Sequence, residues 1–305
     1  AFWRDGSSEI GINRRVKTSE GVVMAPNPDG QYHRQLWTLE LKPTNPHSPG
    51  CVIFSHACHP VILYGCQWTS ISSEWPGRCR KALRAELGEG THCQFMQGLA
   101  GNIRPRILAD FENQTFRTSV PEDVELTGQQ IAKDVLQTLA QDAPPLPLQL
   151  GAARGWFVAR RGEPKPREHW EELQHSDDEL TREVGQYWLT RFGADAIAPY
   201  TTQPFPIGLV RFAPQHWLVY TAGEPLCEWY EIFQKALPGQ KLVACGYTHA
   251  SAAYIPTDAL LDEGGYEIDR SPQFSRSGPG VLQPGLDAAV TESLHQLQAG
   301  IDQSP

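Results

Sequence analysis

The sequence predicts an α/β fold in which mixed β-sheets are packed by helices. Alternating apolar residues, as in 35–41, indicate strands joined by turns over about the first fifty residues. The apolar run 51–54 indicates a buried strand, whereas 74–87 and 124–140 have the spacing and end signals of helices. At 305 residues the chain is predicted to form a single domain, 1–305.

The two helices of the first half have recognisable boundaries. Ser72 or Ser73 can cap the first helix, and Gly88 lies just beyond its end. The apolar residues of the second helix fall near one face, which is typical of a helix packed on a core. The proline-rich run 143–147 then stops it.

Residues 163–192 form a charged segment that carries Trp170 and Trp188. The pattern predicts one or two amphipathic surface helices. The simpler interpretation is a solvated helical insertion, and a lid over a site is the alternative.

The remainder of the second half alternates strands and helices. The expected order is a hairpin of 209–212 and 217–221, a helix ending at 237, a strand at 241–246 and a closing helix at 284–301. No internal repeat is visible in the sequence.

Charge and hydropathy exclude two classes of partner. The chain has 26 Lys and Arg against 35 Asp and Glu, a net charge of -9, and its arginines are scattered. Nucleic-acid binding needs clustered cations, so we expect no nucleic-acid partner. No apolar run is long enough to cross a bilayer, so we expect no transmembrane segment.

The seven cysteines include no Cys-x-x-Cys pair, so neither a zinc ribbon nor a disulfide framework is predicted. Most are expected to be buried free thiols. The chain begins Ala1-Phe2-Trp3, without an initiator Met, and no signal peptide is visible.

Two histidines follow the predicted buried strand. His56 and His59 stand at its end, and the loop is broken by Pro60, which leaves imidazole nitrogens available for a zinc ion. Glu224 and Tyr254 also stand where strands end and loops begin. Taken singly, each has a structural explanation: a hydrogen-bonded histidine, a helix N-terminal carboxylate or a core aromatic.

Two common catalytic motifs are absent. The run Gly98-x-x-Gly101-Asn102 lacks the Lys-Ser/Thr ending of a phosphate-binding loop. No Gly-x-Ser-x-Gly sequence occurs, so a serine triad is not indicated.

Four blocks together resemble the neutral/alkaline non-lysosomal ceramidase family, specifically its catalytic domain and bacterial relatives. The blocks are 11–15 with 26–30; 57–60 with 71–77; 97–105; and 223–225 with 254–257 and 265–267. Their order and spacing follow the family nearly from end to end.

The resemblance implies zinc (Zn²⁺) as cofactor and hydrolysis of the amide of an N-acyl sphingoid base by a metal-activated water. Carried over by position, it makes His59, Glu224 and Tyr254 metal ligands. It makes Arg14 and Tyr266 the catalytic groups that contact the scissile bond and stabilise the oxyanion. The implied partner is a small-molecule or lipid-like N-acyl substrate.

The sequence departs from the family in three ways. The opening segment that supplies the first histidine ligand has no counterpart, and His56 or His249 are the available substitutes. Arg104 stands where the family has a serine, which favours activated water over a serine nucleophile; Arg104 and Asn102 are expected to contact substrate. The blocks include no counterpart of the family's immunoglobulin-like C-terminal domain, so a membrane-lipid substrate is expected less firmly than an N-acyl substrate in general.

The leading hypothesis is therefore a zinc-dependent hydrolase of the neutral ceramidase-like class, a zinc amidohydrolase. One alternative is a hydrolase on the same scaffold that acts on an ester, another N-acyl compound or a carbohydrate derivative. Another is a metal-free, non-enzymatic relative.

Overall fold

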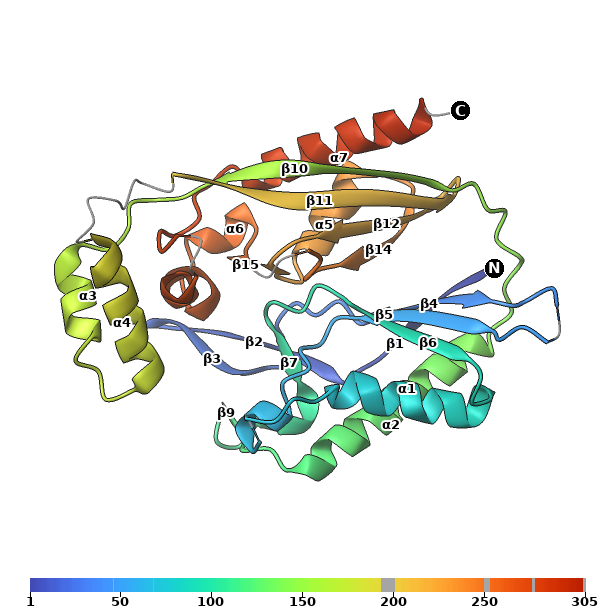
Figure 1. Cartoon of the computed structure of the whole chain (residues 1–305), viewed down its shortest axis with the longest axis horizontal. Helices are drawn as coiled ribbons and strands as arrows, with labels where there is room; N and C mark the ends of the chain where they lie inside the picture. Colours follow the sequence, from blue (N-terminus) through green and yellow to red (C-terminus); the bar gives the residue numbers. More distant parts are fainter. Residues whose placement is uncertain (46, 68, 193–200, 250–252, 276–277, 304–305) are drawn as a thin grey trace.

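A computed structural model describes residues 1–45, 47–67, 69–192, 201–249, 253–275 and 278–303. Two four-stranded sheets lie between two layers of helices (Figure 1). The first sheet has the order β1 (Phe2–Ser7), β4 (Gln35–Leu41), β5 (Cys51–His56), β6 (His92–Gln97). The second has the order β10 (Gly151–Arg160), β11 (Thr202–Ala213), β12 (His216–Thr221), β14 (Lys241–Cys245).

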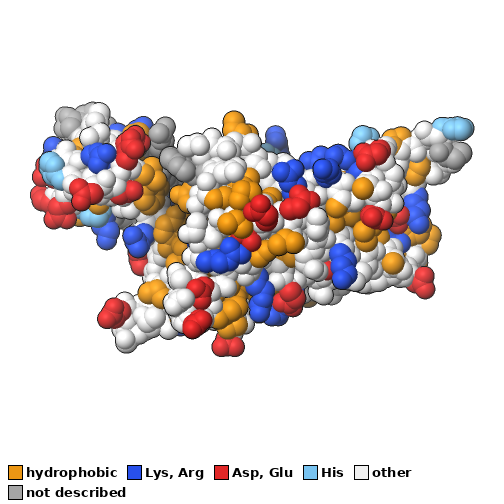
Figure 2. Space-filling model, turned by 90° about the horizontal axis from the view of Figure 1, so that it is seen from below, with side chains coloured by type: hydrophobic (Ala, Val, Ile, Leu, Met, Phe, Trp, Pro, Cys, Tyr) orange, Lys and Arg blue, Asp and Glu red, His pale blue; other side chains and the backbone are white. Residues whose placement is uncertain are grey.

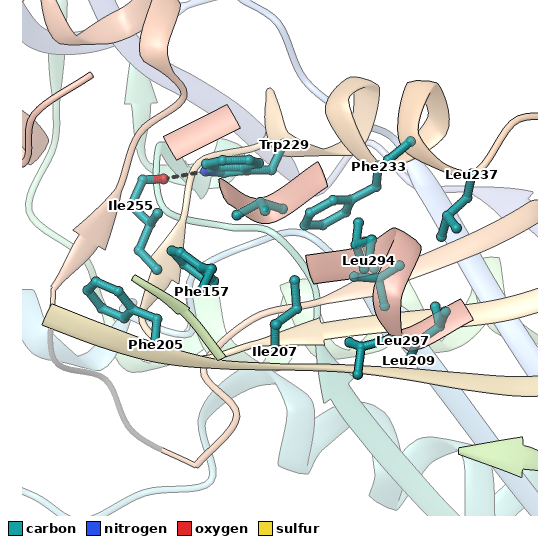
Figure 3. Close-up of a cluster of buried hydrophobic side chains, with 14 of the residues drawn as sticks. Phe157, Phe205, Ile207, Leu209, Trp229, Phe233, Leu237, Ile255, Leu294 and Leu297 are labelled. Carbon is teal, nitrogen blue, oxygen red and sulfur yellow. Dashed lines mark hydrogen bonds between the residues drawn. The ribbon is translucent and has the colours of Figure 1, made fainter. Parts of the chain in front are cut away.

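Helices cover the outer face of each sheet. In the first half α1 (Glu74–Leu87) and α2 (Pro121–Leu139) pack on the sheet through a core that includes Phe54, Trp75 and Ile131. In the second half α5 (Trp229–Ala236) and α7 (Leu286–Asp302) do the same, and Figure 3 shows their core. Stacking of the layers removes these apolar faces from water. This hydrophobic burial is the main stabilising contribution to each half.

The inner faces of the two sheets pack on each other. Trp37 and Leu39 of β4 meet Leu218 of β12 and Val243 of β14 in a third core. Hydrogen bonds tie the strand ends together: Gly246 N–H donates to Gln97 O at 3.0 Å. The two sheets therefore share a buried core.

Smaller elements lie at the edge of this sandwich. A three-stranded sheet has the order β3 (Gly21–Asn27), β2 (Gly11–Thr18), β7 (Ile103–Pro105), and β13 (Glu224–Pro225) pairs in parallel with β15 (Tyr254–Ile255). The remaining elements are β8 (Ala109–Asp110), β9 (Thr115–Phe116), α3 (Arg167–Leu173), α4 (Glu179–Phe192), α6 (Asp258–Leu261), the 3₁₀ turns Leu63–Gly65, Arg106–Leu108 and Ser271–Phe274, and the π-helical turn Tyr266–Arg270.

The predicted fold class is confirmed: mixed sheets packed by helices. The helix at 74–87 is confirmed at both ends, and the second helix begins at Pro121, earlier than the predicted 124. The hairpin, the strand at 241–246 and the closing helix are present, as are helices within 163–192. The single domain 1–305 and the helical insertion at 163–192 stay predictions.

All seven cysteines are free thiols, and five of them are buried. Within the described residues, no helix combines the length and apolar character needed to cross a membrane.

Candidate functional site

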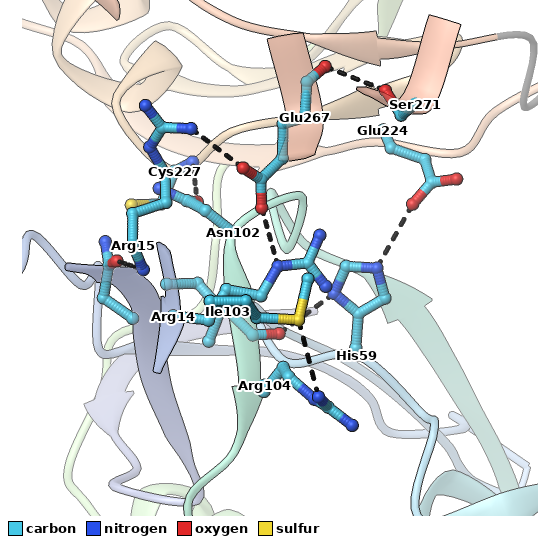
Figure 4. Close-up of polar contacts among 12 residues, drawn as sticks. Arg14, Arg15, His59, Asn102, Ile103, Arg104, Glu224, Cys227, Glu267 and Ser271 are labelled. Carbon is cyan, nitrogen blue, oxygen red and sulfur yellow. Dashed lines mark hydrogen bonds and ion pairs between the residues drawn. The ribbon is translucent and has the colours of Figure 1, made fainter. Parts of the chain in front are cut away.

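His59 is held in one orientation by the backbone of β7. Its main-chain N–H donates to Ile103 O at 3.1 Å, and its Nδ1 lies 3.0 Å from the same carbonyl oxygen. A carbonyl can only accept, so Nδ1 carries the hydrogen. Its Nε2 then faces Glu224, whose Oε2 is 3.2 Å away (Figure 4). Histidines that bind metals are typically oriented in this way.

Glu224 and Tyr254 are direct neighbours on adjacent parallel strands, β13 and β15. Gly223 makes the close approach of these strands feasible: its φ is +75°, and a Cβ there would lie 2.8 Å from Ala253 O. Burial acts to raise the pKa of Glu224, but hydrogen bonds from His59 and Tyr254 outweigh it and hold the pKa below its usual value. Burial raises the pKa of Tyr254, so this phenol keeps its proton near neutral pH.

Arg14 is fixed beside this pair by a buried carboxylate. Its Nε donates to Glu267 Oε1 at 2.7 Å, and Arg15 Nη1 donates to the other oxygen at 2.8 Å. The Arg14 guanidinium lies 5.4 Å from the ring centre of Tyr254 and 5.5 Å from that of Tyr266. Its Nη2 is buried and has no hydrogen-bond partner among the described residues. A buried donor without a partner is costly, so Nη2 is a group that an acceptor oxygen would satisfy.

Tyr266 borders a cavity that is also lined by residues of α4. The rings of Tyr254 and Tyr266 are 5.7 Å apart, edge to face, and burial raises the pKa of Tyr266. A cavity of about 470 Å³ opens next to it, lined mainly by aromatic and apolar side chains that include Tyr64, Val184 and Trp188. Figure 2 shows hydrophobic side chains in the hollow between the lobe of α3 and α4 and the body of the molecule.

Arg104 and Asn102, which were both expected to contact substrate, differ in their exposure and in their hydrogen-bond partners. Arg104 is half-buried; its Nη1 is 3.6 Å from Met24 Sδ, and its guanidinium stacks on Phe116 at 4.6 Å. Asn102 is fully buried, and both ends of its amide are engaged: Nδ2 donates to Glu228 at 3.0 Å and Oδ1 accepts from Cys227 N–H at 2.9 Å. The Asn102 side chain thus links Glu228 to the backbone at Cys227, whereas the Arg104 guanidinium is partly exposed.

The structure does not offer His56 as a substitute metal ligand. Its Nε2 lies 2.6 Å from Tyr32 Oη and its Nδ1 lies 3.0 Å from Gln35 O, so both ring nitrogens are occupied. Burial lowers the pKa of His56 to about 4, which keeps the ring neutral. His249 packs against Tyr220, with ring centres 5.6 Å apart.

Two residues of the site were not predicted from the sequence. Glu267 holds Arg14, and no local pattern distinguishes it from a surface carboxylate. The Tyr247 hydroxyl lies 3.1 Å from His59 Nε2, and Tyr247 has a left-handed backbone with φ of +60°. A non-glycine residue in this conformation is often held there by a site. Its place just after β14, another strand end, is the signal that could have identified it.

The donor atoms fit a zinc ion in part. Among the described residues no three His, Cys, Asp or Glu side chains are grouped to hold a metal, and the third donor that the resemblance implies is the phenol of Tyr254. The contact of 3.2 Å between Nε2 of His59 and the Glu224 carboxylate is favourable only when a proton or a cation lies between the two atoms. A nitrogen and two oxygens are also ligands that zinc accepts.

Comparison with solved structures relates this arrangement to a known fold. The chain is similar to neutral ceramidase from Pseudomonas aeruginosa, with a TM-score of 0.63 and 16% identity, over 100% of this chain and 53% of that one. The fold is that of a ceramidase. A ceramidase complexed with C2 gives a TM-score of 0.65 and 15% identity over 100% and 54% of the two chains.

The ceramidase resemblance seen in the sequence is thus confirmed for the fold. The chain spans about half the length of these ceramidase structures. No protein-family profile matches the sequence, and no curated protein matches it.

Proposed function

We propose that this protein is a zinc-dependent hydrolase of the ceramidase-like class that cleaves an amide bond of an N-acyl compound. The observation that carries the proposal is the convergence of His59 from the first half with Glu224 and Tyr254 from the second, on a fold shared with neutral ceramidase. Fold alone does not determine function, so the weight rests on these side chains.

In this proposal His59, Glu224 and Tyr254 hold the ion. Three protein ligands with an open position are typical of catalytic zinc sites. When bound in such a site, zinc polarises a carbonyl and lowers the pKa of water toward ~7.

The other residues act on the substrate carbonyl. The unpartnered Nη2 of Arg14 and the hydroxyl of Tyr266 are suited to donate hydrogen bonds to the carbonyl oxygen as negative charge develops on it. Glu267 keeps Arg14 in place, so this donor needs little reorganisation. Hydrolysis adds one water across the C–N bond, so that the acyl carbon gains the oxygen and the amine nitrogen gains a proton.

The cavity between Tyr266 and α4 suits the apolar part of an acyl compound. Its volume of about 470 Å³ and its aromatic lining are in the range of small-molecule sites. In this proposal α4 contributes to the substrate pocket.

Metal content tests the proposal. We would measure bound zinc by mass spectrometry in chelator-free wild type, in His59→Ala and in His92→Ala, where His92 is an exposed histidine at the start of β6. We expect near-stoichiometric zinc in wild type and in the control, and loss of both zinc and N-acyl amide hydrolysis in His59→Ala. Equal zinc and equal activity in all three proteins would refute the proposed site.

A further inference from the structure

We infer that Arg104 binds an anionic group of the substrate, so that the preferred substrate is an acidic N-acyl compound. This inference deepens the proposed hydrolase function and rests on it.

The position of Arg104 places it on the substrate side of the site. In the antiparallel pair β2–β7, Ile12 lies opposite Arg104, and Arg14 is two residues further along β2. Arg14 and Arg104 therefore project from the same face as diagonal neighbours, within reach of long side chains. Figure 4 shows the Arg104 side chain beside those of Arg14 and His59.

The charges of this region leave Arg104 without compensation. Arg14 and Arg15 share Glu267, and Arg15 also meets Glu263 at 3.2 Å. Among the described residues no carboxylate forms an ion pair with Arg104, which contacts only a thioether and an aromatic ring. Burial and repulsion by Arg14 lower its pKa, but it keeps its charge at neutral pH.

Such a guanidinium is well suited to a carboxylate. Two parallel N–H···O bonds match the planar groups, and charge-assisted bonds in a half-buried site are stronger than neutral ones. An anion there would also relieve the repulsion between Arg104 and Arg14. Tyr64 lies near enough to influence Arg104 electrostatically and also lines the apolar cavity, so the anion position adjoins the proposed acyl position.

The test uses two matched pairs of substrates. N-octanoylglycine against N-octanoylethanolamine places the carboxylate in the amine half. N-octylsuccinamic acid against N-octylbutanamide places it in the acyl half. We would measure kcat/KM by amine release, and affinity by isothermal titration calorimetry, for wild type, Arg104→Gln, Arg104→Lys and the control Arg106→Gln, which changes an exposed arginine two residues away.

For one of the two pairs we expect wild type to prefer the acid over its neutral partner. In Arg104→Gln the kcat/KM for that acid should fall about 10- to 100-fold while the neutral compound changes by less than about twofold. Arg104→Lys should recover part of the preference, and Arg106→Gln should retain it all. The pair that responds shows which half of the substrate carries the anion.

The outcomes separate this inference from the proposed function. Cleavage of acid and neutral compounds with the same preference in wild type and Arg104→Gln would overturn the inference and leave the hydrolase intact. An equal loss on both compounds would show that Arg104 is only structural, which also overturns it. If no amide is cleaved but the acid binds in an Arg104-dependent way, the anion site stands and the hydrolase proposal fails; equal binding of acid and neutral compounds would refute the anion site.

Discussion

The two halves of the molecule are built alike but contribute different groups to the site. In each four-stranded sheet two antiparallel pairs are followed by one parallel pair, and a helix connects the parallel strands: α1 between β5 and β6, and α5 between β12 and β14. His59 stands three residues after the end of β5 at His56, and Glu224 stands three residues after the end of β12 at Thr221. The same place in the two halves thus supplies an imidazole and a carboxylate.

The halves differ in how firmly they hold these groups. The His59 side chain is 8% exposed, and one carbonyl holds both its Nδ1 and the main-chain N–H of the residue. The Glu224 side chain is 23% exposed and has Tyr254 as its neighbour on the parallel strand pair β13–β15. The first half therefore supplies a more deeply buried imidazole, and the second supplies a carboxylate that is more exposed. Neither half has the site alone, so the site depends on the packing between them.

The sharpest way to break this pairing is Glu224→Gln. The change keeps the shape and removes the charge that faces His59 and Arg14. If the proposed function holds, loss of several kcal/mol of charge stabilisation lowers the rate of amide hydrolysis by more than about a hundredfold. Zinc content and kcat should fall together, while the circular dichroism spectrum stays the same. Full activity in this variant would mean that the second half does not take part in the chemistry.

The buried anion that holds Arg14 should matter most for stability. Glu267→Gln leaves Arg14 and Arg15 without their shared carboxylate, and we expect a loss of about 3–5 kcal/mol in the free energy of unfolding, measured with urea. Glu9→Gln is the control, since the Glu9–Arg34 pair is exposed and should contribute no more than about 1 kcal/mol. Similar losses in both variants would show that the carboxylate shared by Arg14 and Arg15 has no special role in stability.

Acid should weaken the contact between the halves. His56 lies in the first sheet, and His33 stacks on Tyr230 of α5 at 3.5 Å; burial lowers the pKa of both histidines from 6.5 to about 4. Between these pH values the unfolded chain binds protons that the folded chain does not. The free energy of unfolding should therefore be constant above pH ~6.5 and fall toward pH ~4, by on the order of 3 kcal/mol for His56.

Urea unfolding of wild type and His56→Gln at a series of pH values checks this. The variant starts from a lower stability because its hydrogen bonds to Tyr32 and Gln35 change. Its stability should nevertheless fall less steeply below pH ~6.5. Parallel curves for the two proteins would assign the acid sensitivity to other groups.

A smaller perturbation changes only the distance between the halves. Gly101 N–H donates to Pro225 O at 2.9 Å, and a Cβ at Gly101 would lie 2.6 Å from Glu224 O. Gly101→Ala should cost about 1–3 kcal/mol through this backbone clash, and it should reduce activity because Glu224 is displaced. Gly90→Ala, where a Cβ meets nothing within 4 Å, is the matched control and should leave both unchanged. Loss of stability without loss of activity would separate the packing of the halves from the geometry of the site.

The sequence could predict those features whose signals lie in adjacent residues, and it could not predict contacts between residues far apart in the chain. The helix 74–87 was predicted at both ends because its start and stop signals lie in the adjacent residues. His59, Glu224 and Tyr254 came from strand ends and block resemblance, and the structure brings them together. The contact of Arg14 with Glu267 spans 253 positions and has no local signal. The shared topology of the sheets could not be predicted because no internal repeat is visible in the sequence.

Tyr247→Phe is the mildest test of the comparison. Tyr247 comes from the second half, and its hydroxyl reaches the Nε2 of His59 in the first at 3.1 Å. Removing the hydroxyl deletes its contacts with His59 and with the Glu224 carboxylate, for which we expect about 0.5–1.5 kcal/mol, or up to about a tenfold change in kcat/KM for amide hydrolysis. Tyr220→Phe, on β12 of the same half and half-buried, is the control and should change kcat/KM little. A loss as large as that of Glu224→Gln would mean that Tyr247 takes part in the chemistry directly, and that the second half contributes one more group to the site than the strand-end pattern predicts.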